Sequence, residues 1–218
     1  MKGDKINVNE EHIKAARQLM SMLFDQITES QNRYIVTIAG ESGSGKSEIA
    51  TAFADLLSEE GINSVIFQQD DYFVYPPETN AGMRRKNIDH VGLSEVRLAL
   101  LDRHLKEILD MEGEIEKPLV IFEEDQITRE MVKLDGIKVI IVEGTYTTLL
   151  ENVHQHVFID MTYVDTKEAR LRRAREEQDE FLETILEIEH GIISSHKSRA
   201  DIIVTKDYRV RKNNENRK

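Results

Sequence analysis

The sequence has no cysteine and no tryptophan, and only three of its residues are proline. Without cysteine, the chain can form neither a disulfide framework nor a thiolate metal site. The first residues also lack a continuous apolar segment, so we expect no signal peptide and no membrane span. These absences predict a cytoplasmic protein with no membrane partner.

Basic residues are fewer than acidic ones. The formal net charge is -12 over 218 residues, which argues against a broad nucleic-acid-binding surface but leaves room for a local basic site. Hydrophobic residues make up 39% and charged residues 32% of the chain, as in soluble globular proteins. The length suits one α/β domain, or at most two small ones.

One stretch of the chain matches a phosphate-binding pattern at every fixed position. Gly40-Glu41-Ser42-Gly43-Ser44-Gly45-Lys46-Ser47 fits G-x-x-x-x-G-K-[ST], the P-loop or Walker A pattern. The apolar run 34–39 before it is typical of a buried strand. Residues 47–60 after it have apolar side chains at helical spacing, and Gly61 follows as a stop signal. A chance match in a Gly/Ser turn is the alternative, and this strand and helix argue against it.

The residue types of the loop suit a triphosphate. Backbone N–H groups at a helix N-terminus attract anions, and Gly40, Gly43 and Gly45 let the backbone approach phosphate oxygens closely. Lys46 can bridge the β- and γ-phosphates, and the Ser47 hydroxyl can ligate Mg²⁺. We therefore expect ATP and Mg²⁺ as cofactors, with residues 40–47 as the binding loop.

Carboxylates follow two further predicted strands. Asp70 and Asp71 come after residues 63–67, and Glu143 follows the apolar run 137–142. In open α/β sheets the ligand crevice lies at the carboxyl ends of the strands. One of the two aspartates is therefore placed to meet an acceptor hydroxyl, and Glu143 to hold Mg²⁺ directly or through water. The alternatives are an ordinary polar exit from the strand and a helix-capping carboxylate.

The remaining segments complete an alternation of strands and helices. Residues 9–30 predict an amphipathic helix capped by Asn9, which packs on the sheet or alternatively forms a dimer. Residues 74–91 predict a long loop with a basic run at 84–86, and residues 94–111 predict a helix. Further strands are expected at 119–122, 157–159 and 201–204, with a polar loop or ribbon at 123–129, a helix at 181–190 and a charged, frayed tail at 209–218.

Arginines gather on the helix that follows the strand at 157–159. Arg170 and Arg173 are three residues apart and share a helix face, where they could clamp phosphate oxygens. Exposed arginines paired with neighbouring glutamates are the alternative. Together the elements predict an α/β fold of P-loop NTPase type, with a mostly parallel sheet and helices on both faces. We expect a single domain over 1–218, with an N-terminal helix at 1–30, a lid-like segment at 165–180 and the tail at 209–218.

These segments together resemble the uridine kinase/phosphoribulokinase family of P-loop kinases over roughly 34–208. The matching motifs are Gln69-Asp70-Asp71-Tyr72-Phe73, Asn87-Ile88-Asp89-His90, Glu143-Gly144, the arginine helix at 165–175 and Ala200-Asp201-Ile202-Ile203. The resemblance implies that Asp70 is the general base and that Ser47, Asp70 and Glu143 surround Mg²⁺. It implies that Lys46, Arg170 and Arg173 act in catalysis, with Asp71, Phe73, Asp89, His90, Phe122 and Arg129 near the substrate.

The sequence departs from the uridine kinases at three positions. Ile88 stands where they carry a base-packing Phe, Ile127 where we expect their base-reading His, and Glu123 where they have Asp. Hydrogen-bond discrimination of a base needs polar groups, which isoleucine lacks. The expected acceptor is therefore a small metabolite with a hydroxyl group: a nucleoside, a sugar, a sugar phosphate or another small alcohol.

Two classes of function compete at this stage. The first is an ATP- and Mg²⁺-dependent kinase; the second is a nucleotide-dependent binding or regulatory protein, with residues 84–86 as a partner surface. No guanine-reading N-K-x-D motif occurs, which weakens a GTPase reading, and the carboxylate at Asp70 favours the kinase. The choice between ATP and GTP, between Asp70 and Asp71 as base, and between a monomer and a homo-oligomer stays open.

Overall fold

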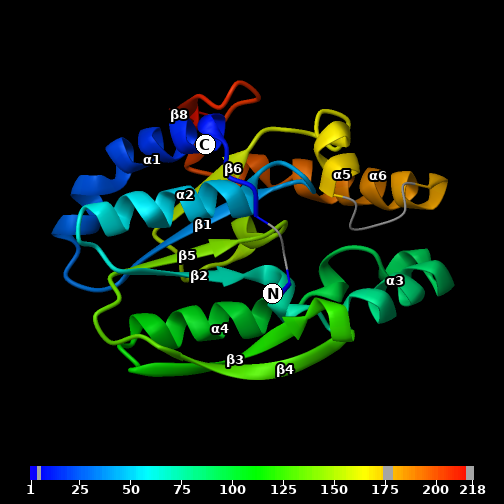
Figure 1. Ribbon diagram of the computed structural model, residues 1–218, viewed down its shortest axis with the longest axis horizontal. Helices are drawn as coiled ribbons and strands as arrows, with labels where there is room; N and C mark the ends of the chain where they lie inside the picture. Colours follow the sequence, from blue (N-terminus) through cyan, green and yellow to red (C-terminus); the bar gives the residue numbers. More distant parts are fainter. Residues whose placement is uncertain (4–5, 174–178, 215–218) are drawn as a thin grey trace.

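A six-stranded sheet forms the centre of the protein (Figure 1). The computed structural model describes residues 1–3, 6–173 and 179–214, excluding the side chains of residues 172 and 173. The strand order is β2-β5-β1-β6-β7-β8, and every pair is parallel except β7 with β8. The strands are β1 (Tyr34–Gly40), β2 (Ser64–Gln68), β5 (Val139–Glu143), β6 (Gln155–Ile159), β7 (Ile202–Val204) and β8 (Val210–Lys212).

Parallel register brings the functional motifs to one edge of the sheet. β5 lies between β1 and β2, with Ile38 and Gln68 both opposite Glu143. The carboxyl ends of these three strands therefore lead side by side into the phosphate loop, the Asp70 segment and Gly144. β1 and β5 are buried along their whole length, as expected of parallel strands covered on both faces.

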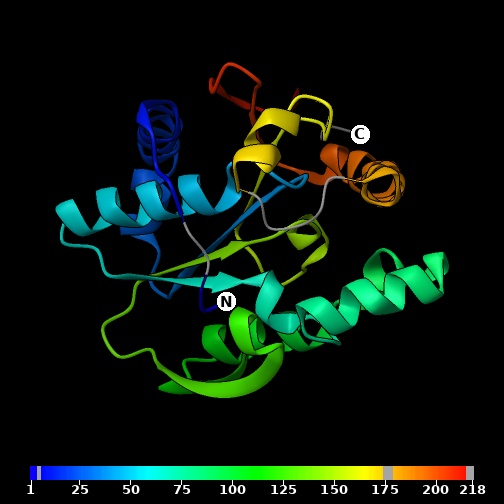
Figure 2. The same cartoon turned by 45° about the vertical axis from the view of Figure 1, so that its right-hand side comes forward.

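Helices cover both faces of the sheet, which confirms the predicted fold class (Figures 1 and 2). α1 (Glu10–Glu29) and α2 (Lys46–Glu59) share one apolar core with β1, β5 and β6. α4 (Leu98–Leu109) packs in a second core on the opposite face. The predicted helix at 9–30 and its Asn9 cap are both confirmed. Asn9 Oδ1 accepts hydrogen bonds from Glu11 N at 3.0 Å and His12 N at 3.1 Å.

A separate two-stranded antiparallel sheet lies beyond α4. β3 (Glu114–Ile121) pairs with β4 (Gln126–Lys133), and a short 3₁₀ turn, η4 (Phe122–Glu124), lies between them. The hairpin is longer than the predicted strand at 119–122. Of the two options open for 123–129, the ribbon is correct from residue 126 onward.

The predicted loop at 74–91 is wrong over most of its length. It contains α3 (Pro77–Lys86) and the 3₁₀ turn η2 (Ile88–His90), after the 3₁₀ segment η1 (Gln69–Tyr72). α3 begins with proline at a favourable first-turn position. Its N-terminal N–H groups donate to Asp125 of the hairpin, with Glu78 N 2.7 Å from Oδ1 and Thr79 N 3.2 Å from Oδ2. This cap lies far along the chain, so local reasoning missed the helix.

The helix predicted at 94–111 begins later than expected. A 3₁₀ turn, η3 (Leu93–Glu95), comes first, and Val96 then forms an isolated antiparallel bridge with Phe73. Another 3₁₀ turn, η5 (Thr147–Leu149), follows β5, and η6 (Lys197–Arg199) precedes β7. The tail prediction at 209–218 is wrong where β8 adds an antiparallel strand, and residues 215–218 lie outside the described residues.

Two helices stand across the carboxyl edge of the sheet from α3 (Figure 1). They are α5 (Lys167–Arg173) and α6 (Glu180–Ser194). Asp179 caps α6 by accepting a hydrogen bond from Leu182 N at 2.8 Å. The predicted lid-like segment 165–180 thus includes α5 and the first residue of α6, while its residues 174–178 lie outside the described ones. No helix in the described ranges is long and apolar enough to cross a membrane.

Candidate functional site

The phosphate loop has the backbone of an anion cradle. Gly40, Gly43 and Gly45 have φ values of 156°, 77° and 89°, and Gly43 and Gly45 lie in the left-handed region that favours glycine. A Cβ on Gly43 would stand 2.8 Å from Arg170 Cγ. Ser44 Oγ is buried and has no hydrogen-bond partner among the described residues. The loop therefore leads into the N-terminus of α2 with the close approach and polar groups that a phosphate needs.

Lys46, Ser47 and Glu143 meet beside this cradle. Lys46 Nζ donates to Glu41 O at 3.0 Å, and Ser47 Oγ donates to Glu143 Oε1 at 3.1 Å. Gln68 Nε2 donates to the same Glu143 oxygen at 3.2 Å. Burial, followed by the nearby Asp70 charge, raises the pKa of Glu143, against the lowering effects of Lys46, Ser47 and Gln68. A carboxylate whose ionised form is disfavoured in this way is suited to a cation that restores the balance.

The adjacent aspartates lie in different surroundings. Asp70 lines the pocket together with Lys46, Ser47 and Glu143. Asp71 is 2% exposed and points into the hairpin, where Oδ2 accepts from Lys117 Nζ at 2.6 Å and Oδ1 from Val120 N at 3.0 Å. The α-amino group of Met1 lies 2.9 Å from Asp71 Oδ1. Asp70 therefore faces the site, and Asp71 joins η1 to β3.

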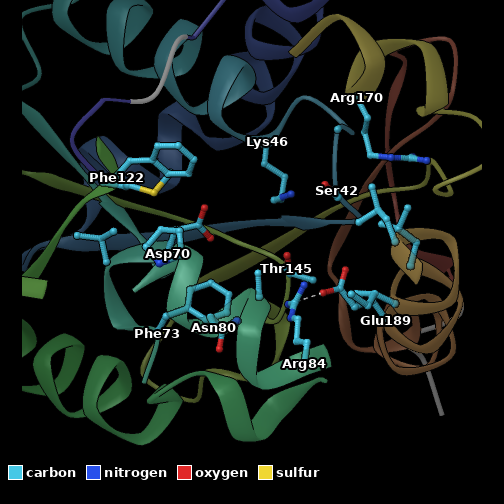
Figure 3. A pocket seen from close by; sticks show the side chains of 18 of the residues that line it. Ser42, Lys46, Asp70, Phe73, Asn80, Arg84, Phe122, Thr145, Arg170 and Glu189 are labelled. Carbon is cyan, nitrogen blue, oxygen red and sulfur yellow. Dashed lines mark hydrogen bonds and ion pairs between the residues drawn. The ribbon is translucent and has the colours of Figure 1, made fainter. Parts of the chain in front are cut away.

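One pocket extends from the phosphate loop to α3 and α6 (Figure 3). Phe73 and Phe122 line it on the side of Asp70 (Figure 3), and Met1 and Val120 also line it. At the far end Arg84 Nη2 donates to Glu189 Oε1 at 2.9 Å, which links α3 to α6 across the pocket. The pocket is also lined by Tyr75, Pro77, Asn80, Ala81, Thr145, Leu182, Ile185 and Leu186.

Sequence reasoning missed the polar residues at this far end. Asn80 and Arg84 fell in the predicted loop at 74–91, and Glu189 in the helix predicted at 181–190, and none of the three was predicted to line a site. The basic run was seen, but Arg84 turns inward to Glu95 and Glu189 instead of outward. The spacing of Gly92 and Glu95 gave a further signal, since a glutamate three residues after a helix start often closes back on the preceding backbone.

Several predicted substrate residues lie outside the pocket lining. Asp89 is exposed on η2, and Arg129 is exposed on β4, where it pairs with Glu116 at 3.3 Å. His90 contacts two residues that do line the pocket, with its Nε2 3.1 Å from Asn80 Oδ1 and its ring beside that of Tyr75. Ile88 is 36% exposed and does not line the pocket.

The start of α5 is fastened to the phosphate loop. Thr166 Oγ1 donates to Ser42 O at 2.8 Å, and Arg170 Nη1 donates to Thr166 Oγ1 at 2.7 Å and to Tyr163 O. Glu41 accepts a hydrogen bond from Tyr163 N, and its Oε1 lies 2.7 Å from His190 Nδ1 of α6. The 6% exposed Arg170 thus lies over the loop, whereas the Arg173 side chain lies outside the described residues.

The site's donor set fits a nucleotide with a magnesium ion. Mg²⁺ is usually held by one or two carboxylates together with phosphate oxygens and water. Ser47, Glu143 and Asp70 provide oxygen ligands of that kind beside the phosphate cradle. In the described ranges no cluster of three or more His, Cys, Asp or Glu side chains is arranged to hold a metal by protein groups alone.

Comparison with known families gives one match over most of the chain. The sequence model described as "Phosphoribulokinase / Uridine kinase family" matches residues 35–187. The match begins in β1 and ends within α6, so it includes the phosphate loop, Asp70 and Glu143.

Individual relatives agree with this match. The chain is 30% identical to a uridine kinase of Clostridium novyi (strain NT), over 78% of this chain and 86% of the relative. It is 28% identical to the bifunctional alpha-galactosidase/sucrose kinase AgaSK of Mediterraneibacter gnavus, over 82% of this chain but only 20% of that longer protein. The phosphoribulokinase structure from Rhodobacter spheroides shares the fold, with a TM-score of 0.62 at 16% identity over 81% of this chain and 71% of that one.

Proposed function

The chain belongs to the phosphoribulokinase/uridine kinase family of small-metabolite kinases, and we propose that it transfers the γ-phosphoryl group of ATP to a hydroxyl of a small metabolite, with Mg²⁺. Family membership makes it a phosphotransferase with an alcohol group as acceptor. The acceptor is a nucleoside, a sugar or a sugar phosphate. The observation that carries the proposal is that Lys46, Ser47 and Glu143 line the same pocket as Asp70 and the residues of α3 and α6.

Each residue has a role in this reaction. Phosphoryl transfer depends mainly on positioning and on stabilising the charge of the transferred group. The loop N–H groups and Lys46 would bind the phosphates, and Ser47, Glu143 and Asp70 would hold Mg²⁺, which would neutralise phosphate charge. Asp70 also orients the acceptor hydroxyl and accepts its proton. Arg170 stabilises charge on the phosphates from the α5 side, and Arg173 has the same proposed role.

The test is ATP consumption with Mg²⁺ across a panel of nucleosides, free sugars, sugar phosphates and other small alcohols, with product mass measured in parallel. We expect turnover with one acceptor class and a loss of at least about a hundredfold in Lys46→Ala. Arg17→Ala on the exposed side of α1 is the control and should match the wild type. ATP hydrolysis that no acceptor stimulates, with no phosphorylated product, would contradict the proposal.

A further inference from the structure

The two left-handed glycines of the phosphate loop are covered by different parts of the chain. A Cβ on Gly43 would stand 2.8 Å from Arg170 Cγ and 3.3 Å from Thr166 Cβ, and both of these residues lie within the family match at 35–187. A Cβ on Gly45 would stand 3.0 Å from His12 Nε2 and 3.2 Å from His12 Cδ2. His12 belongs to α1, which precedes the family match. The phosphate loop therefore has a contact from a helix outside the residues that the family shares.

The His12 ring is held against Gly45 by the start of its own helix. The side chain is 7% exposed, and its Nδ1 accepts a hydrogen bond from the Asn9 backbone N–H at 3.2 Å. Burial lowers the pKa of His12, against the raising effects of Glu48 and Glu11, so the imidazole is neutral at neutral pH. Because Nδ1 accepts a hydrogen bond, the proton of the neutral ring is on Nε2, the nitrogen that faces Gly45.

Tyr208, which follows the family match, packs on the same ring. Its aromatic ring lies edge-on to that of His12 with the centroids 5.5 Å apart, and its Oη lies 3.5 Å from His12 Nε2. Tyr208 has a φ of 58°, a left-handed conformation that is uncommon for residues other than glycine. α1 holds this turn, since Gln18 Nε2 donates to Tyr208 O at 3.0 Å and Gln18 Oε1 accepts from Val210 N at 3.1 Å. α1 therefore fixes both His12 and Tyr208 beside the phosphate loop.

The place of Gly45 in the loop makes this contact relevant to nucleotide binding. Gly45 is the N-cap of α2, with a φ of 89°, and it directly precedes Lys46 and Ser47, which line the pocket. Glycine has more backbone freedom than any other residue, so side chains packed against its Cα restrict the peptide groups that face the phosphates. A loop already held in its binding shape loses less conformational freedom when the ligand binds. His12 itself does not line the pocket, so any effect on the nucleotide acts through the loop.

We propose that His12 is a positioning residue for the phosphate loop, held in place by Gln18 and Tyr208, and that segments on both sides of the family match thereby take part in nucleotide binding. The inference rests on the proposed function, since it assumes that the loop binds MgATP. Small displacements of binding groups are costly, because a misplacement of about 1 Å can reduce catalysis by about a hundredfold.

His12→Gln separates this role from helix capping. Residue 12 is the third residue of α1, where glutamine commonly accepts a hydrogen bond from the N-cap N–H, so the variant keeps the cap and loses the ring beside Gly45. We expect the Kd for MgATP, measured by isothermal titration calorimetry, to rise about tenfold. The melting temperature should fall by a few degrees at most. Tyr208→Phe keeps its ring and loses only the hydroxyl, so the Kd should rise about threefold.

His104→Gln is the matched control. His104 of α4 is 6% exposed, and its Nδ1 lies 2.9 Å from Tyr72 Oη with the two rings edge-on at 5.6 Å. It thus has the burial and the tyrosine partner of His12, but α4 packs in the core on the opposite face of the sheet from α1. We expect the control to lose at least as much melting temperature, with the Kd for MgATP changed less than about twofold. Hydrogen exchange at residues 40–47 should become faster in His12→Gln and stay unchanged in His104→Gln.

The outcomes distinguish failure of this inference from failure of the proposed function. A wild type that binds MgATP, with the same Kd in His12→Gln, would overturn the positioning role and leave the proposed function intact. Equal weakening in the two histidine variants would mean that His12 serves stability alone, which would also overturn the role. A wild type that does not bind MgATP would contradict the proposed function and this inference together. If His12→Gln does not fold, an unchanged Kd in Tyr208→Phe would overturn the inference.

Discussion

The adjacent carboxylates of Asp70 and Asp71 have different roles because their side chains point to different sides of a short turn. Asp70 faces the pocket, and Asp71 faces Lys117, although both belong to the same 3₁₀ segment, η1. Lys117 is 4% exposed and also lies 2.6 Å from Glu130, so Asp71 completes a buried charged cluster under the hairpin. This separation gives opposite expectations for the same substitution at the two positions.

Asp70→Asn and Asp71→Asn form a matched pair of variants. Asp70→Asn removes the proposed base, so turnover should fall at least about a hundredfold while MgATP still binds and the melting temperature changes little. Asp71→Asn weakens a buried charge-assisted bond to Lys117, so the free energy of unfolding should fall by about 1–3 kcal/mol. Steady-state kinetics and urea denaturation measure the two effects. A large stability loss in Asp70→Asn with normal turnover would exchange these roles.

The sequence predicted the elements whose signals lie within a short window. It missed the elements that are stabilised by contacts with residues far along the chain. The phosphate loop, β1, β5 and α1 were predicted because their apolar spacing, glycines and the Asn9 cap lie within one short window. α3 was missed because its cap, Asp125, is a residue of the hairpin turn, and its inward arginine is held by Glu95 and Glu189. β8 was missed because a charged antiparallel edge strand has no apolar signal of its own.

The two arginines at the end of α3 give a test at the level of this element. Arg84 pairs with the buried Glu95, whereas Arg85 is 54% exposed, pairs with Asp179 at 2.9 Å and lies 4.7 Å from the ring centroid of Phe181. Arg84→Gln leaves a buried carboxylate without its cation, which should cost about 3–5 kcal/mol of unfolding free energy. Arg85→Gln should cost about 1 kcal/mol or less.

Urea denaturation of both variants measures this difference, with added salt as a second variable. Salt should diminish the small Arg85 effect more than the Arg84 effect, because screening acts mainly on exposed charges. Equal losses in the two variants would mean that α3 is held by surface pairing, and that the Arg84–Glu95 pair contributes no more than an exposed ion pair.

At the scale of the whole molecule, two carboxylates that repel each other lie at the carboxyl edge of the sheet, where the phosphate loop, the Asp70 segment and Glu143 meet. A parallel sheet brings Asp70 and Glu143 together beside the phosphate loop, and the buried Glu143 has its pKa raised by burial first and by Asp70 second. Part of this arrangement was predictable, because alternating strands and helices predict a parallel sheet and the carboxylates follow their strands directly. The far end of the pocket was not, since Asn80, Arg84 and Glu95 meet only after α3 folds against η3.

The raised pKa of Glu143 has a defined consequence for stability. A carboxyl whose pKa is higher in the folded than in the unfolded protein binds protons more tightly when folded. Its contribution to stability therefore decreases as pH rises from the ordinary glutamate pKa of about 4.3 through the raised value. For Glu143 the loss should be greatest at neutral and alkaline pH in the absence of Mg²⁺, where no cation offsets the buried charge.

Glu143→Gln removes this pH dependence while keeping the size of the side chain. Without nucleotide and Mg²⁺, the variant should melt a few degrees above the wild type at pH 8, with a smaller difference near pH 5. Turnover should nevertheless be lost, and MgATP should raise the wild-type melting temperature more than that of the variant, because a bound ligand stabilises by mass action. Thermal denaturation across this pH range, with and without MgATP, measures both effects. A wild type that is more stable than the variant at pH 8 without ligand would contradict this expectation. It would mean that the hydrogen bonds from Ser47 and Gln68 stabilise ionised Glu143 by more than its burial destabilises it.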